Sequence, residues 1–233
     1  CFSAGHGHEI GAHPVLAEQG MIQRVRRALD EAGRPVALYT EQMPNDITSQ
    51  YTDAAFDYSL WGPRDFASPA KLHLFRFAFP DFKVIQLFHP GIDPRAASEE
   101  DARIAFFHGE ALWLKGRARS WYSEECRAFI QKANRIFHDY REAFTSRDVE
   151  PFLPTEMNGL FANRFSTEKE DLITLYNATC HTLRGALLKW PKAVKKVEDS
   201  WGMDEFKFHV SDPTTTIQGS VPPHGIGCLV ISK

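Results

Sequence analysis

A carboxylate follows a short apolar segment near the start of the chain, where residues 35–38 are apolar and residue 41 is a glutamate. This pattern predicts a buried strand over residues 35–41 that ends on Glu41. Residues 15–32 carry apolar side chains at helical spacing directly before it, as in the repeating unit of parallel α/β folds. Chemistry in such folds lies at the carboxyl ends of the strands, where a partly buried carboxyl group can act as a general acid or base. The alternative is that Glu41 only ends the strand and pairs with a surface arginine.

Histidines near the predicted strand ends offer hydrogen bonds to a ligand. His89 directly follows a second apolar segment, residues 82–88, and so corresponds in position to Glu41. His6 and His8 lie in a glycine-rich stretch, where a zinc site would need a third ligand that the spacing does not supply. Imidazole does exchange hydrogen bonds with hydroxyl groups, which makes a polar ligand the better interpretation. We therefore expect no metal and no other cofactor.

The composition excludes several classes of protein. The chain has 233 residues, 43% of them hydrophobic, which is enough for a sizeable core, and its formal net charge of −3 offers no basic surface for nucleic acid. No apolar run approaches the roughly eighteen residues of a membrane-spanning helix, so we expect no membrane partner. Cys1, Cys126, Cys180 and Cys228 are too widely spaced for a metal-binding CxxC pair or a disulfide framework. Residues 177–179 match the N-glycosylation tripeptide, which often occurs by chance.

The period of the apolar residues changes along the chain. Up to about residue 120, helical patterns alternate with apolar segments, and we expect helices over residues 49–60 and from residue 98 toward residue 114. A long amphipathic helix is predicted over residues 123–144. Beyond residue 151, short β-rich segments alternate with turns. The strands expected there cover residues 159–165, 172–177, 205–210, 214–218 and 227–232.

These patterns predict three parts. Residues 1–120 form an α/β part, residues 121–150 a linking helix, and residues 151–233 an antiparallel β-sandwich.

The order of these parts resembles the carboxyl-terminal portion of a glycoside-hydrolase-like (β/α)8 barrel followed by its accessory β-sandwich. The residues that carry the resemblance are Cys1, 6–8, 39–41, 105–114, 160–165, 173–177 and 221–225. They resemble an uncharacterised family of such barrel proteins, grouped as a domain of unknown function. The resemblance implies an α/β plus all-β fold, in which a partial (β/α)8 (TIM-type) barrel lacks a segment upstream of Cys1. It also implies a carbohydrate partner and hydrolysis of a glycosidic bond.

Glycoside hydrolysis uses two carboxyl groups across the scissile bond. Under this interpretation Glu41 is one catalytic residue, and the second comes from a strand upstream of this chain. The candidates within the chain are Asp46, Asp53, Asp57 and Glu110. Asp53 and Asp57 are four residues apart, so on the predicted helix they would share a solvated face.

Aromatic residues near the strand ends can stack on sugar rings. Tyr39, Trp61 and Trp113 are the candidates, and ordinary core packing is the alternative for each. Glu110 lies between Gly109 and Trp113, where it either faces the cleft or simply ends a helix. Together with the three histidines above, these four residues are the predicted substrate-binding set.

Two other functions remain open from the sequence. The chain could bind carbohydrate without cleaving it, or it could belong to an amidohydrolase that uses Cys1 as an amino-terminal nucleophile.

Overall fold

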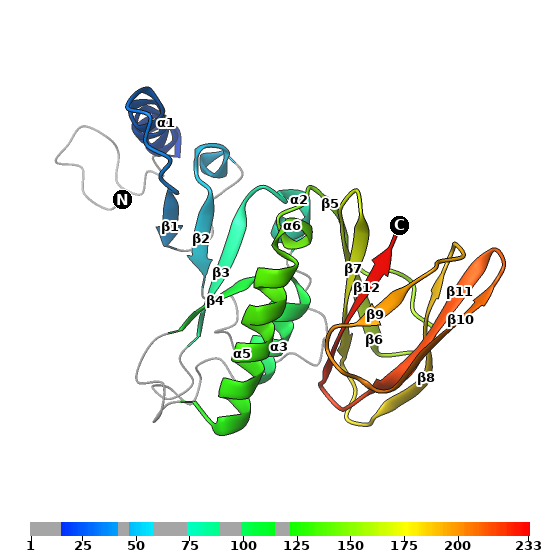
Figure 1. Ribbon diagram of the computed structural model, residues 1–233. Helices are drawn as coiled ribbons and strands as arrows, with labels where there is room; N and C mark the ends of the chain where they lie inside the picture. Colours follow the sequence, from blue (N-terminus) through cyan, green and yellow to red (C-terminus); the bar gives the residue numbers. More distant parts are fainter. Residues whose placement is uncertain (1–14, 42–46, 58–73, 89–98, 115–121) are drawn as a thin grey trace.

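The computed structural model describes residues 15–41, 47–57, 74–88, 99–114 and 122–233. A four-stranded parallel sheet organises the amino-terminal part, and its strands lie side by side in chain order (Figure 1). The strands are β1 (Tyr39–Glu41), β2 (Ala54–Asp57), β3 (Lys83–Phe88) and β4 (Ala111–Leu114). Neighbouring parallel strands in chain order need crossover connections, which is the arrangement of repeated βα units.

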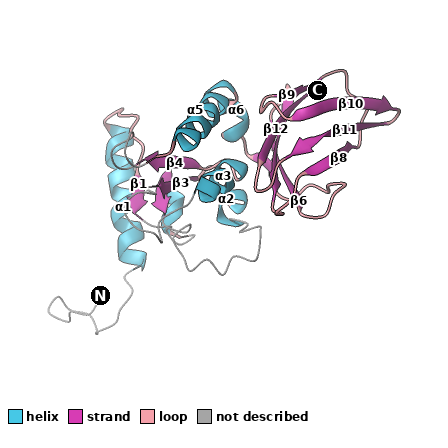
Figure 2. Ribbon diagram, turned by 90° about the horizontal axis from the view of Figure 1, so that it is seen from below, coloured by secondary structure: helices cyan, strands magenta, loops and turns pink. Residues whose placement is uncertain are grey.

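Helices cover one face of this sheet. Val84 packs with Phe75 of α2, and Phe88 packs with Ala105 of α3 and Ile130 of α5. Figure 2 places these helices between the parallel sheet and the carboxyl-terminal sheets. The helices of this layer are α2 (Leu74–Ala78), α3 (Glu99–Phe107), α5 (Glu124–Asp139) and α6 (Arg141–Phe144), whereas α1 (Val15–Glu31) lies beside β1 (Figure 2).

The prediction of a helix over residues 49–60 is wrong. Its described residues, 49–57, belong to a short 3-10 helix, η1 (Thr48–Tyr51), and then to strand β2. Asp53 holds the chain between the two, because its carboxylate accepts a hydrogen bond from the backbone N–H of Leu38 at 2.7 Å and pairs with Arg26 of α1. These contacts align β2 with β1. Pairing between the two strands, and not the local helical pattern of the sequence, therefore determines that residues 54–57 are extended.

Two predicted helices end or break earlier than expected. Helix α3 ends at Phe107 instead of continuing toward Leu114, because Gly109 has a φ of +70° and turns the chain into β4. The helix predicted over residues 123–144 is confirmed in extent but is divided into α5 and α6 at Tyr140, whose φ and ψ are −112° and 32°.

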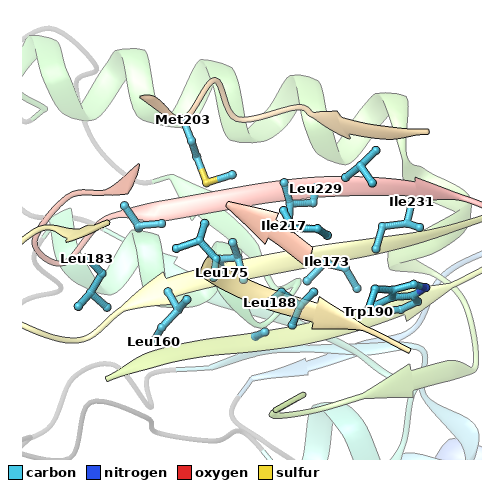
Figure 3. Packing of buried hydrophobic residues seen from close by; sticks show 14 residues of the cluster. Leu160, Ile173, Leu175, Leu183, Leu188, Trp190, Met203, Ile217, Leu229 and Ile231 are labelled. Carbon is cyan, nitrogen blue, oxygen red and sulfur yellow. The ribbon is translucent and has the colours of Figure 1, made fainter. Parts of the chain in front are cut away.

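Two antiparallel sheets form the carboxyl-terminal part. Their strand orders are β5-β6-β7-β12-β9 and β10-β11-β8. Figure 3 shows side chains of both sheets, among them Leu175, Leu229, Leu188 and Ile217, gathered in one buried cluster between them. The strands are β5 (Asp148–Glu150), β6 (Leu160–Ser166), β7 (Glu170–Asn177), β8 (Leu183–Trp190), β9 (Val197–Asp199), β10 (Asp204–Ser211), β11 (Thr214–Val221) and β12 (Ile226–Ser232).

The predicted change from an α/β part to an antiparallel β part is confirmed. The five strands expected beyond residue 151 correspond to β6, β7, β10, β11 and β12. Strands β5, β8 and β9 were not predicted. Strand β8 lacks a regular alternation, since Gly185 has a φ of +128° and the register with β11 shifts beside it.

The five-stranded sheet is buried on both faces. One face meets the three-stranded sheet, and the other packs on the helices, where Phe165 and Tyr176 contact Phe106, Phe107 and Phe144. The rings of Phe144 and Phe165 lie 5.1 Å apart between centroids. Helix α5 contributes to this cluster and to the one beneath the parallel sheet, so the boundaries predicted at residues 120 and 150 remain a prediction.

The asparagine of the N-glycosylation tripeptide has a structural role. Asn177 is fully buried, and its Nδ2 donates to the carbonyl oxygens of His181, Val221 and Pro222 at 2.8, 3.0 and 2.9 Å. Its Oδ1 accepts a hydrogen bond from the N–H of Thr179. An amide used in this way is not accessible for glycosylation in the folded chain.

The described cysteines and helices bear on the expectations about disulfides and membrane spans. Cys126 and Cys228 are buried free thiols, and Cys180 is an exposed free thiol. Among the described helices, none combines the length and the apolar character that crossing a membrane requires.

We predict that Gly109→Ala destabilises the protein far more than Gly33→Ala. Both glycines follow a helix at positive φ, +70° and +63°, so either substitution costs about 1 kcal/mol in backbone strain. A Cβ on Gly109 would lie 2.8 Å from the Phe165 ring, whereas a Cβ on Gly33 would have nothing within 4 Å. Urea unfolding should therefore show a further loss of about 1–3 kcal/mol for Gly109→Ala. Equal losses for the two variants would mean that the seam between α3 and β6 is not closely packed.

Candidate functional site

The face of the parallel sheet opposite the helices carries Glu41. Residues in register share a face, and side chains alternate along each strand. Glu41 is in register with Phe56, and Phe56 with Ile85, whereas Val84 and Phe88 point to the helices. The residues on the side of Glu41 are Tyr39, Glu41, Ala54, Phe56, Lys83, Ile85, Leu87, Ala111 and Trp113.

Three aromatic rings meet on this face. Phe56 and Trp113 are 4.5 Å apart between ring centroids, Tyr39 and Phe56 are 6.1 Å apart, and Tyr39 and Trp113 are 6.4 Å apart. Tyr39 is on β1 and Trp113 on β4, and strands so separated in a flat sheet would be about 14 Å apart. The rings meet because the sheet curls toward them, so we call this side the concave face.

The concave face is exposed at its edge strands, whereas Ala54 and Leu87 on the inner strands are buried. Tyr39 is 58% exposed and Trp113 is 41% exposed. Glu41 is also exposed, so the expectation of a partly buried carboxylate is wrong. The buried strand predicted over residues 35–41 is wrong in the same way, because only Tyr39–Glu41 form a strand and residues 35–37 are exposed. The arrangement places a carboxylate at the carboxyl edge of β1, next to aromatic surfaces that a ligand can contact.

The two other aspartates near β2 do not join Glu41. Asp57 is only 8% exposed and is in register with Gln86, on the side that faces the helices. Asp53 pairs with Arg26, as described above, and the predicted helical face shared by Asp53 and Asp57 is not formed. Among the described strand residues of the concave face, Glu41 is therefore the sole carboxylate.

Glu110 lies on the side of the sheet that faces the helices, whereas Glu41 is on the concave face. It is nearly level with Glu41 along the strands, because the next residue, Ala111, is in register with Ile85 and Phe56. It directly precedes β4, is 1% exposed, and accepts a hydrogen bond from Nε2 of Gln86 at 2.8 Å. Arg76, fully buried in α2, donates from Nη2 to the carbonyl oxygen of Phe144 at 2.9 Å. Burial lowers the pKa of the Arg76 guanidinium, and the Glu110 carboxylate acts in the opposite direction. These contacts give Glu110 a structural role in the layer between sheet and helices.

The structure thus places three predicted site residues on one face: Tyr39 and Trp113, whose rings meet, and Glu41, two residues from Tyr39 on β1. Phe56 joins them but was missed, because residues 54–57 were assigned to a helix. Within the described residues, no group of three His, Cys, Asp or Glu side chains could hold a metal ion. The predicted residues that lie outside the described part of the chain are Cys1, His6, His8, Asp46, Trp61 and His89.

Comparison with solved structures gives the fold. An α-amylase from H. orenii superposes with a TM-score of 0.59 at 15% identity, over 94% of this chain and 58% of that one. An α-amylase from Geobacillus thermoleovorans, complexed with acarbose, gives a TM-score of 0.63 at 11% identity, over 92% and 57%. A putative α-galactosidase from Bacteroides fragilis gives 0.58 at 10% identity, over 97% and 53%.

The chain shares an amylase-like barrel-and-sheet fold over the matched part. It spans little more than half the length of these proteins. No family profile matches the sequence, and no curated protein matches it.

We predict that Glu110→Gln destabilises the protein. The substitution keeps the size of the side chain but removes the negative charge that partly offsets the buried Arg76 guanidinium. Leaving a buried charge uncompensated typically costs about 3 kcal/mol, which urea unfolding can measure. Glu124→Gln, at an exposed position in the first turn of α5, is the control and should change little. Unchanged stability in Glu110→Gln would contradict the structural role.

Proposed function

We propose that the protein is a carbohydrate-active enzyme of the glycoside-hydrolase type, with Glu41 as one of its two catalytic carboxyl groups. The observation that carries the proposal is the position of Glu41 at the carboxyl end of β1, exposed on the concave face that also holds the paired rings of Tyr39 and Trp113. Carboxyl edges are where barrels of this type hold their active sites. We also place the chain in the uncharacterised barrel family that its sequence resembles.

The concave face supports completion of the sheet into a barrel. A sheet that curls toward exposed aromatic residues, with helices on its outer side, has the curvature of a barrel wall. We propose that β1 to β4 are the last four strands of an eight-stranded barrel and that upstream sequence supplies the others. Completion would bury the lower part of the concave face and leave the carboxyl edge as the rim of the site.

The chemistry requires a second carboxyl group across the scissile bond from Glu41. A separation of about 5–5.5 Å would give a retaining enzyme, and about 6.5–9.5 Å an inverting one. Asp57 and Glu110 do not qualify, since both face the helices, and Asp53 pairs with Arg26. The second carboxylate we propose therefore comes from an upstream strand or from Asp46, which lies outside the described residues. One carboxyl group protonates the departing glycosidic oxygen, and the other attacks the sugar or activates water.

The substrate we propose is an α-linked glycoside. The similar proteins are described as α-amylases and an α-galactosidase, one of them bound to acarbose. Tyr39 and Trp113 would contact the apolar faces of sugar rings, since pyranose C–H groups pack well on aromatic rings. His6, His8, Trp61 and His89 remain candidates for further contacts at the rim.

A second candidate function is carbohydrate binding without cleavage. It is favoured by the single carboxylate on the concave face of the described strands, because hydrolysis needs two. Binding would use the same aromatic residues, so the two functions differ in turnover and not in the position of the ligand.

We predict that Glu41→Gln abolishes most hydrolysis by the protein that contains this chain. The amide keeps the size of the side chain but cannot transfer a proton, so turnover should fall by about 10²-fold or more. The measurement is turnover on maltooligosaccharides and 4-nitrophenyl α-glycosides, with the melting temperature recorded for each variant. Since Glu41 is exposed, folding should not be affected.

The matched control is Glu31→Gln, at an exposed position at the end of α1. It should retain parental turnover. Full activity in Glu41→Gln would remove this residue from the catalytic pair. A protein that binds these sugars with the same affinity in both variants, but cleaves none, would establish the non-catalytic function.

A further inference from the structure

A cavity of about 410 Å³ lies on the far side of the helices from the concave face. It is formed where α3, α5 and two loops of the carboxyl-terminal sheets meet. Arg103 of α3, Lys132 of α5 and Trp201 between β9 and β10 line it, with Pro222 and Pro223 from the loop between β11 and β12. The volume is in the range of small-molecule sites.

The ionisable residues in the lining, Arg103 and Lys132, are both cations. In the described part of the chain Arg103 makes no ion pair. The carboxylates near the cavity make other contacts: Glu100 accepts from the Tyr176 hydroxyl at 2.6 Å and lies 2.8 Å from Nδ1 of His224, and Asp199 accepts from three consecutive backbone N–H groups. No carboxylate is among the described residues that line the cavity, so its wall carries two positive charges, which favours an anionic ligand.

Aromatic and proline side chains form the rest of the wall. The ammonium of Lys132 lies 4.7 Å from the centroid of the Trp201 ring, a cation–π contact that holds the charge at the cavity. The Phe129 ring lies 5.5 Å from that of Trp201, and both prolines are exposed. Such a wall suits the apolar face of a ring attached to the anionic group.

We propose that this cavity binds a monosaccharide that carries a phosphate or carboxylate group. Arg103 and Lys132 bind the anionic group by charge-assisted hydrogen bonds, and Trp201 with the prolines contacts the ring. The requirement for an anion rests on the two cations. The choice of a sugar as the ring rests on the proposed function.

Isothermal titration calorimetry at low salt tests the proposal, with glucose 6-phosphate as the probe and glucose and inorganic phosphate as comparisons. Glucose 6-phosphate should bind more tightly than either. Arg103→Gln should weaken its binding about tenfold, and Lys132→Gln, at an exposed position, about threefold. The control is Arg135→Gln, an exposed cation on α5 that does not line the cavity, which should leave binding unchanged.

Three results would overturn the proposal: glucose binding as tightly as glucose 6-phosphate, inorganic phosphate binding as tightly as the sugar phosphate, or equal effects of Lys132→Gln and Arg135→Gln. The Glu41→Gln variant should bind glucose 6-phosphate normally, because Glu41 is on the other side of the helices. Loss of hydrolysis and loss of this binding are therefore separate outcomes, and failure of one proposal can be distinguished from failure of the other.

Discussion

Helices α3 and α5 pack against the parallel sheet on one side and against the five-stranded antiparallel sheet on the other. The relative positions of the two sheets depend on this packing. Ala105 and Ile130 face the parallel sheet, while Phe106 and Ile136 face the five-stranded antiparallel sheet. Each large apolar side chain buried in this way contributes about 1.5–3 kcal/mol. The layer can form only if the backbone after α3 approaches the sheet closely, which Gly109 permits at the Phe165 ring.

This layer determines which face of the parallel sheet is available for chemistry. Because the helices occupy one side, the exposed side chains of Tyr39, Glu41 and Trp113 are on the other side, which curls toward its own aromatic residues. Tyr39 and Trp113 come from the two edge strands, yet their rings are 6.4 Å apart, so the curvature is what assembles the candidate site. The carboxyl-terminal sheets support this geometry from outside the helices and contribute no residue to the concave face.

The sequence predicted much of the architecture and part of the site. Helical and two-residue periods identified α1, α3, the α5–α6 segment and five of the antiparallel strands, because these elements bury one regular face. Short elements were missed: β2 and β4 have only four residues each, too few for a period to be recognised. Glu41 was found because it follows an apolar segment, but its exposure depends on packing between distant strands. The structural role of Glu110 likewise depends on Gln86 and Arg76, which are 24 and 34 residues away.

The central claim is that Glu41 and its aromatic neighbours form part of a site for an α-linked glycoside. A crystal structure of the whole protein with acarbose bound would test it most directly. The account predicts that a carboxylate oxygen of Glu41 lies within about 3.2 Å of the atom that joins two rings, with the ring of Tyr39 or Trp113 against a sugar face. Acarbose bound away from the concave face, or Glu41 too far from the inter-ring bond for a hydrogen bond or a bridging water, would contradict the account.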